Sequence, residues 1–298
     1  MTTRQFLRSE TLEAEISADG AELVGLRHTV FGDLLWGGDP MWWEGQAPIL
    51  FPVVGRCRSD RITVGGRSYP MPLHGFARSS TFEVLDASAG RCRLALSDSP
   101  HTRTMYPFAF RLEVDYRLDG DTLTIAAGIA NPGDGALPAS VGFHPGFRWP
   151  LQPHLAKPDH ALLFEEDDFI DVSRAAHGHI LAHTSRFELA DRRLRLDESL
   201  FGRGAMVLLS PRSRRVTFGA SGSDLSIEVG FETMTMLGLW MRPGADFLCI
   251  EPWSGHGDPV GFHGEFGEKP GMSTIPPGET LSRGMTIRIA PSPANDLP

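Results

Sequence analysis

The feature that most constrains the fold is a pair of long segments in which apolar and polar residues alternate. Every second residue from Phe108 to Leu118 is apolar, and the residues between them from position 111 onward are charged. Side chains of a β-strand point to opposite faces in turn, so a period of two indicates a strand with one buried face. Asp119-Gly120-Asp121 then supplies turn chemistry, and the alternation resumes from Leu123 to Ile129. The pattern predicts a long antiparallel β-hairpin.

Shorter segments with the same alternation occur along the chain, at residues 92–96, 225–231 and 285–289. The chain has 33 glycines and 23 prolines, as expected where many short strands are joined by tight turns. Amphipathic helical patterns are scarce. We therefore predict an all-β protein, a large antiparallel β-sandwich with few short helices. No segment divides the chain as a linker would, so residues 1–298 are expected to form a single domain.

The composition excludes several classes of protein. The net charge is −9 and no basic stripe is present, which argues against a nucleic-acid partner. No segment approaches the roughly 18 consecutive apolar residues that a membrane span needs, and the N-terminus lacks the apolar core of a signal peptide. Cys57, Cys92 and Cys249 are an odd number without metal-ligand spacing, which favours free thiols. We therefore expect a cytoplasmic protein without a membrane partner.

Four short segments place titratable residues among glycine, proline and aromatic residues, a composition typical of functional loops. They are Phe51–Arg56, Pro72–Arg78, Val141–Phe147 and Cys249–Trp253. The third segment suggests a turn that presents His144 at a sheet edge.

The fourth segment predicts a buried strand that ends in Glu251. A carboxylate there, beside Trp253, would be partly desolvated, which raises its pKa and makes it a better base. Taken singly, these residues have structural explanations, because a lone histidine among apolar residues is more often a hydrogen-bonded structural side chain. Their joint occurrence with Arg56 favours a functional site.

These segments resemble the aldose 1-epimerase (galactose mutarotase) family, in a less characterised bacterial branch. The resemblance runs from near the N-terminus to the final strand. Its most specific parts are Gly55-Arg56, His74 to Arg78, Gly142 to Pro145 and Glu251-Pro252-Trp253, in the family's order. The resemblance implies the galactose mutarotase-like supersandwich and an isomerase that needs no cofactor and no metal.

The resemblance also implies a role for each residue. Glu251 matches the general base that takes the proton from the C1 hydroxyl. His144 matches the general acid that protonates the ring oxygen, and His74 the second histidine near the anomeric centre. Arg56 matches an arginine that holds sugar hydroxyls. A carboxylate and an imidazole titrate on either side of neutrality, so both suit proton transfer across one C–O bond at pH 7.

Other positions are candidates for binding the sugar. Asp197 is the best match for the family's hydroxyl-binding aspartate, and Trp253 is expected at the pocket. Arg78 suits a phosphate or sulfonate group on the sugar, although a surface ion pair explains it equally well. Trp42-Trp43 could stack on a sugar, or one of the two could pack in the core.

We therefore expect an aldose 1-epimerase that equilibrates the anomers of a hexose or an anionic hexose. The alternative is a non-catalytic carbohydrate-binding or sugar-sensing protein of the same fold. A metal centre that includes His256 and His263 is disfavoured because their spacing matches no compact ligand motif. The expected partner is a small-molecule sugar, and the expected state is a monomer or homodimer.

Overall fold

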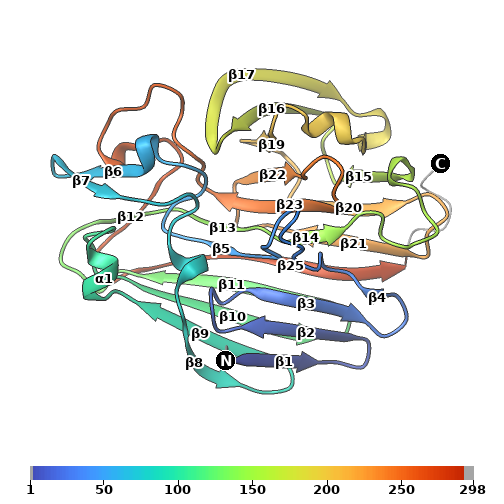
Figure 1. Cartoon of the computed structure of the whole chain (residues 1–298), viewed down its shortest axis with the longest axis horizontal. Helices are drawn as coiled ribbons and strands as arrows, with labels where there is room; N and C mark the ends of the chain where they lie inside the picture. The colour runs from blue at the N-terminus through green and yellow to red at the C-terminus, as the bar shows by residue number, and fades with distance from the viewer. Residues whose placement is uncertain (1–2, 292–298) are drawn as a thin grey trace.

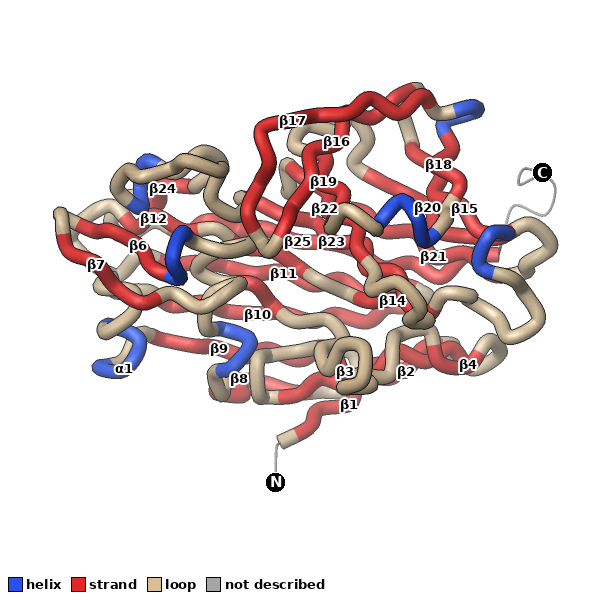
Figure 2. The backbone as a smooth tube through the Cα atoms, turned by 45° about the horizontal axis from the view of Figure 1, so that its top comes forward, coloured by secondary structure: helices blue, strands red, loops and turns tan. Residues whose placement is uncertain are grey.

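The computed structural model describes residues 3–291, which form an antiparallel β-protein (Figures 1 and 2). Residues 1–2 and 292–298, which the predicted domain includes, lie outside the described residues. The predicted all-β, antiparallel fold is confirmed. The largest sheet has nine strands, in the order β18 (Arg193–Arg195), β15 (His160–Phe164), β20 (Arg215–Ala220), β21 (Leu225–Gly230), β25 (Thr280–Pro291), β11 (Thr122–Ala130), β10 (Arg111–Asp119), β9 (Arg91–Ser97) and β8 (Glu83–Ala87).

The second large sheet has eight strands. Its order is β17 (His179–Glu188), β16 (Phe169–Ala176), β19 (Ala205–Leu208), β22 (Met236–Trp240), β23 (Phe247–Ser254), β13 (Val141–Phe143) and β5 (Ile49–Leu50), with β14 (Gly146–Arg148) also paired to β23. The smaller sheets are β1 (Arg4–Arg8), β2 (Leu12–Ser17), β3 (Leu23–His28) and β4 (Gly32–Asp33), then β12 (Leu137–Ala139) with β24 (Ser273–Ile275), and β6 (Arg61–Val64) with β7 (Arg67–Pro70).

Helical segments are short, as predicted. The α-helix α1 spans Pro100–Arg103 and begins with a capping box formed by Ser99 and Thr102. The 3₁₀ helices are η1 (Arg58–Asp60), η2 (Ala77–Ser79), η3 (Lys157–Asp159), η4 (Ala190–Arg192), η5 (Glu198–Phe201) and η6 (Phe266–Glu268). None of the helices described in residues 3–291 is long and apolar enough to cross a membrane. The three cysteines are buried and free.

The predicted hairpin is present as β10 and β11, with Leu112 opposite Ile129 and Tyr116 opposite Ile125. The first strand begins at Arg111 rather than at Phe108. Phe108 precedes the strand because its backbone N–H donates to the Tyr106 carbonyl oxygen at 2.8 Å instead of joining the ladder. Its ring also packs against Tyr106, 4.8 Å between ring centroids. The alternation therefore located the hairpin and its buried face.

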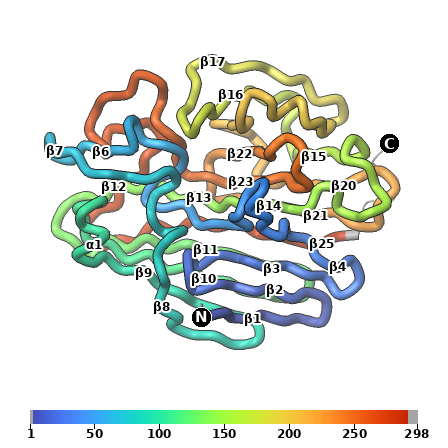
Figure 3. The backbone as a smooth tube through the Cα atoms, in the orientation of Figure 1, coloured from blue at the N-terminus to red at the C-terminus, as the bar shows by residue number. Residues whose placement is uncertain are grey.

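Most buried apolar residues form one hydrophobic core that the sheets share, and a smaller cluster that includes Leu50, Val207 and Trp253 lies on the eight-stranded sheet. The N-terminal sheet, β1 to β4, lies across β9 and β10, as the chain trace in Figure 3 shows. The Tyr116 hydroxyl crosses this junction and donates to the Ala21 carbonyl oxygen at 2.6 Å. Strand β23 lies in the middle of the eight-stranded sheet and is buried along its whole length.

The prediction that a strand ends at Glu251 is wrong, because β23 continues to Ser254 and places Glu251 in its middle. The extension is possible because β22 pairs with β23 as far as Met236 opposite Trp253. The Trp253 ring packs over Gly238, where a Cβ atom would lie 2.8 Å from the indole.

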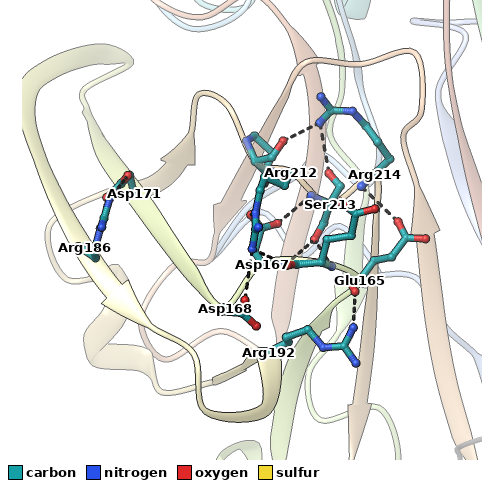
Figure 4. A network of polar contacts seen from close by, with 11 residues as sticks. Glu165, Asp167, Asp168, Asp171, Arg186, Arg192, Arg212, Ser213 and Arg214 are labelled. Carbon is teal, nitrogen blue, oxygen red and sulfur yellow. Dashed lines mark hydrogen bonds and ion pairs between the residues drawn. The ribbon is translucent and has the colours of Figure 1, made fainter.

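A polar network fixes the outer end of the β16–β17 hairpin (Figure 4). The buried Asp167 carboxylate accepts hydrogen bonds from the backbone N–H groups of Arg212 at 3.0 Å and Ser213 at 2.8 Å. Across the hairpin, Arg186 donates two hydrogen bonds to Asp171, at 2.9 and 2.8 Å. One end of the hairpin is thereby anchored, while the turn at the other end reaches a cavity.

Candidate active site

A cavity of about 440 Å³ lies where the loops after β5, β13 and β16 meet the middle of β23. This volume is within the usual range of small-molecule sites. The cavity brings together all but one of the predicted site residues, namely Arg56, His74, Arg78, His144, Glu251 and Trp253. They come from segments up to 197 positions apart in the sequence, from residue 56 to residue 253, so it is the fold that brings them together.

His144 and Glu251 form a close pair at the base of the cavity. His144 lies in the turn between β13 and β14, and its Nε2 atom is 3.1 Å from Oε2 of Glu251. Glu251 is 1% exposed and His144 7%. Neither oxygen of Glu251 has an aligned hydrogen-bond donor among the described residues, and Nδ1 of His144 is likewise unpartnered. Buried polar atoms are nearly always paired in proteins, so these atoms mark a place for a polar ligand.

Burial sets the protonation of this pair. It raises the pKa of the Glu251 carboxyl well above its usual range, against the opposing effect of the Trp253 indole N–H. Burial also lowers the pKa of His144 well below its usual range, and neighbouring His74 adds to the shift. Both directions favour the uncharged forms. These directions favour one titratable proton on the pair, held by the Glu251 carboxyl, beside a neutral His144.

His74 has a fixed tautomer. The backbone N–H of Gly55 donates to its Nδ1 at 3.1 Å, so the proton of the neutral ring is on Nε2. Burial, with the charges of Arg78 and Arg56, lowers the pKa of His74 to about 3. Its φ of 64° is in the left-handed region, which a non-glycine residue adopts only when its surroundings enforce it. His74 is thus a neutral hydrogen-bond donor held next to His144, 5.6 Å between ring centroids.

Aromatic rings form one wall of the cavity. The Trp43 ring lies 5.0 Å from the His144 ring, and Trp240 stands edge-on to both, at 5.5 Å from Trp43 and 5.7 Å from His144. Of the Trp42-Trp43 pair, Trp43 is the one that lines the cavity. An aromatic wall suits the apolar face of a sugar ring.

Two arginines face the cavity, and they differ in whether their guanidinium groups are hydrogen-bonded to other residues. Arg56 donates to both carboxylate oxygens of Asp60, at 2.5 and 2.8 Å, and its Nε–H donates to the carbonyl oxygen of His177 at 3.0 Å. The Arg78 guanidinium makes no hydrogen bond or ion pair with any side chain or backbone group of residues 3–291. The surface ion pair considered for Arg78 is therefore absent from this part of the chain.

Asp197 is the predicted site residue that the structure does not bring to the cavity. It precedes η5, where its carboxylate accepts a hydrogen bond from the Ser199 N–H at 2.9 Å. Capping a helix is the usual role of an aspartate in this position, and nothing places Asp197 near a sugar in the cavity.

Sequence reasoning missed two titratable residues that line the cavity, Glu44 and His177. Glu44 is an exposed carboxylate next to Trp43 and has no ion-pair partner among residues 3–291. His177 stands in the turn of the β16–β17 hairpin with a φ of 50°. Its neighbour Gly178 signals a turn, but no local pattern shows that this turn returns to the cavity.

One group of residues within 3–291 has the geometry to approach a metal ion, formed by His144, Cys249 and Glu251, with ligand atoms within 4.8 Å of one another. The Cys249 thiol is buried, and burial raises its pKa well above the usual range. A metal binds the thiolate rather than the thiol, so this burial opposes coordination. His256 and His263 do not belong to the group.

The fold is shared with solved structures of mutarotase-like proteins. A galactose mutarotase related enzyme from Lactobacillus acidophilus matches with a TM-score of 0.91 and 26% identity, covering 99% of this chain and all of that chain. A galactose mutarotase-like protein from Lactobacillus casei matches with a TM-score of 0.89 and 25% identity, covering 96% of this chain and all of that chain. The fold is therefore the galactose mutarotase-like β-sandwich.

Sequence comparison defines the family. The model for the aldose 1-epimerase family matches residues 5–269. The protein LacX of Lactococcus lactis subsp. lactis is 27% identical, covering 95% of this chain and 98% of the relative. This chain belongs to the aldose 1-epimerase family, which confirms the resemblance seen in the sequence.

Proposed function

We propose that this chain is an aldose 1-epimerase that interconverts the α and β anomers of a hexose by opening and closing its ring. The observation that supports the proposal most strongly is the buried pair of Glu251 and His144, whose facing atoms are 3.1 Å apart in the cavity. A base and an acid this close can act on two oxygens bonded to one carbon, which is the arrangement at the C1 atom of a sugar.

Each residue of the pair transfers a proton once during ring opening and once during ring closure. Glu251 takes the proton of the C1 hydroxyl, the electron pair of that O–H bond forms the C1 carbonyl, and the bond from C1 to the ring oxygen breaks. The ring oxygen leaves with the bonding electrons and takes a proton from His144. After rotation about the C1–C2 bond, the C5 hydroxyl oxygen attacks the other face of C1 and gives its proton to His144. Glu251 then gives its proton to the former carbonyl oxygen. The Nε2–H of His74 is available to donate a hydrogen bond to the developing charge.

The number of protons that burial favours on the pair fits this cycle. Burial favours a protonated Glu251 and a neutral His144, whereas the forward step needs the ionised base and the protonated acid. Both arrangements hold one proton. Binding of a polar sugar therefore has only to move that proton within the pair, with no exchange with bulk water.

Arg78 supports an anionic hexose as the preferred substrate. Its guanidinium lines the cavity without a carboxylate partner in residues 3–291, and a guanidinium binds phosphate or sulfonate oxygens in a bidentate manner. A hexose 6-phosphate places its negative charge several bonds from C1, which leaves the anomeric centre free for Glu251 and His144.

The test is anomer exchange measured by NMR magnetisation transfer at equilibrium, on a panel of aldoses and their 6-phosphates. Wild-type protein should accelerate exchange, and Glu251→Gln and His144→Asn should each slow it by about 10²- to 10⁴-fold, the usual contribution of one acid or base. His28→Asn is a matched control, because His28 is as buried as His144, 7% exposed, and lies in the N-terminal sheet away from the cavity. Full activity in either active-pair variant would refute the mechanism.

The same experiment separates the rival function. A non-catalytic sugar-binding or sugar-sensing protein of this fold would shift the sugar resonances without transferring magnetisation between the α and β signals. The buried acid and base favour catalysis, because binding alone requires no proton donor and acceptor at C1.

A further inference from the structure

A buried ion pair lies behind the cavity, between Lys269 and Asp258. Nζ of Lys269 is 3.5 Å from Oδ1 of Asp258, and their side chains are 0% and 7% exposed. Neither of these two atoms makes a hydrogen bond with a described residue. Burying two charges with so few hydrogen bonds is unfavourable for stability compared with apolar packing. A contribution to stability therefore does not explain why this ion pair is present.

Asp258 also bonds to three backbone groups, and its carboxylate lies within hydrogen-bonding reach of the Cys57 thiol. Its Oδ2 accepts from the Arg58 N–H at 2.8 Å, and its own N–H donates to the Arg56 carbonyl oxygen at 2.9 Å. Its carbonyl oxygen accepts from the Ile180 N–H at 3.1 Å. The first two bonds hold the main chain on the C-terminal side of Arg56, and the third ties the same loop to the start of β17.

Three glycines bring these segments into direct main-chain contact. Gly55, Gly178 and Gly257 all line the cavity. A Cβ atom on Gly257 would lie 1.9 Å from the Gly178 carbonyl oxygen, and one on Gly55 would lie 2.6 Å from Gly257. No side chain separates the three backbone segments. A shift of the loop at Gly257 would therefore displace Arg56 directly.

The side chain of Arg56 depends on the same junction. Its Nε–H donates to the His177 carbonyl oxygen, in the hairpin turn, and its backbone N–H donates to the Gly178 carbonyl oxygen at 2.8 Å. Asp258 thus hydrogen-bonds both to the loop that carries Arg56 and to strand β17. The turn before β17 accepts two of the hydrogen bonds that Arg56 donates.

We propose that the Asp258–Lys269 ion pair is a positioning device for Arg56, which fixes where that guanidinium meets the sugar. Lys269 orients the Asp258 carboxylate from behind, and Asp258 fixes the backbone of the Arg56 loop. Neither residue lines the sugar cavity. The inference deepens the proposed function and rests on it, since it assigns the pair to substrate binding rather than to proton transfer.

The test is a double-mutant cycle with steady-state kinetics of anomer exchange. Lys269→Met should raise KM at least tenfold and change kcat by less than threefold, because Glu251 and His144 stand on other elements. In an Arg56→Gln background, Lys269→Met should cause no further rise in KM. An equal KM rise in both backgrounds, or a fall in kcat instead, would overturn the inference.

Two further variants separate positioning from loss of stability. Lys157→Met is the matched control, because Lys157 also has an ion-pair partner, Glu198 at 2.7 Å, and lies outside the cavity; its KM should equal that of the wild type. Asp258→Asn/Lys269→Met removes both charges, so it should fold even where Lys269→Met does not. A raised KM in this folded double variant supports positioning, and a wild-type KM refutes it.

A spectroscopic readout keeps the inference separate from the proposed enzymatic activity. The Nε–H group of Arg56, hydrogen-bonded to His177, should give a resolved ¹H–¹⁵N resonance, assigned by its loss in Arg56→Gln. The resonance should shift or broaden in the folded double variant and stay unchanged in Lys157→Met. If the wild type exchanges no sugar anomers, the proposed function fails while this readout still decides the positioning role. An unchanged resonance in the double variant refutes it.

Discussion

Replacing Glu251 by glutamine should stabilise the folded protein, by an amount that grows with pH. The carboxyl is 1% exposed and has no aligned hydrogen-bond donor among the described residues, and burial raises its pKa. Below its unfolded pKa of about 4.5 the group is protonated in both states and has no effect. Above that pH the unfolded chain ionises while the folded chain stays protonated, so wild-type stability falls relative to the variant.

The size of the effect follows from linkage. Each pH unit between 4.5 and the folded pKa shifts the free energy of unfolding by about 1.4 kcal/mol. An unfolding entropy of about 2.1 cal/mol/K per residue gives about 0.6 kcal/mol/K for the whole chain. The Tm advantage of Glu251→Gln should therefore grow by about 2 °C per pH unit and level off at the folded pKa.

Thermal unfolding followed by circular dichroism between pH 4 and pH 9 checks this prediction. Glu113→Gln is the control of opposite sign, since hydrogen bonds from Arg93 and Arg111 lower the pKa of Glu113. The stability from Glu113 is present above its unfolded pKa and lost as pH falls, so this variant should lose Tm at neutral pH and little in acid. A Tm difference for Glu251→Gln that is independent of pH would show that Glu251 is ionised in the folded protein, and the argument from burial would fail.

Three further predictions concern catalysis and substrate binding. The pH profile of kcat/KM should be bell-shaped, with an acid limb below the ordinary His144 pKa of 6.5 and an alkaline limb above the ordinary Glu251 pKa of 4.5, because burial lowers the pKa of His144 and raises the pKa of Glu251. A limb outside those bounds would contradict the assignment. Arg78→Gln should raise KM about tenfold for a hexose 6-phosphate and much less for the neutral hexose, because a hydrogen bond to a charged group contributes about 1.5–3 kcal/mol; equal effects on both sugars would argue against an anion site. Glu44→Gln should raise KM for sugars several-fold while Asp197→Asn should not, measured by the same exchange assay, and the reverse pattern would restore Asp197 as the hydroxyl-binding carboxylate.

The sequence predicted most of the fold and much of the site because both depend on local patterns. Alternation defined the β10–β11 hairpin, and short motifs named the residues that meet at the cavity, including His74 and Glu251. The error at Glu251 arose because the end of that strand depends on a distant partner. Glu251 appeared to end a strand because Pro252 follows it, yet pairing with β22 carries the strand onward. Asp197 was chosen by similarity of context, and in the structure its carboxylate accepts a hydrogen bond from the Ser199 N–H, two residues along the chain.

The cavity residues that were missed show the same limit. Glu44 follows Trp43 in a loop without any chemical signature, and His177 lies in a hairpin turn like many others. Their importance comes from the return of two loops to the same cavity, which is set by sheet order over more than a hundred residues of chain. No pattern within a short window of sequence contains that information.

The contact among Gly55, Gly178 and Gly257 has a consequence for how the substrate range of this protein can change. A side chain at Gly55 or Gly257 would collide with neighbouring main chain, and one at Gly178 would collide with the Cβ atom of Arg56, so this wall of the cavity is closed to variation by substitution. New sugar preferences in related chains are expected at other positions that line the cavity, such as Trp43, Glu44 and His177. A library for redesigning the specificity should therefore keep the three glycines constant and vary those three positions.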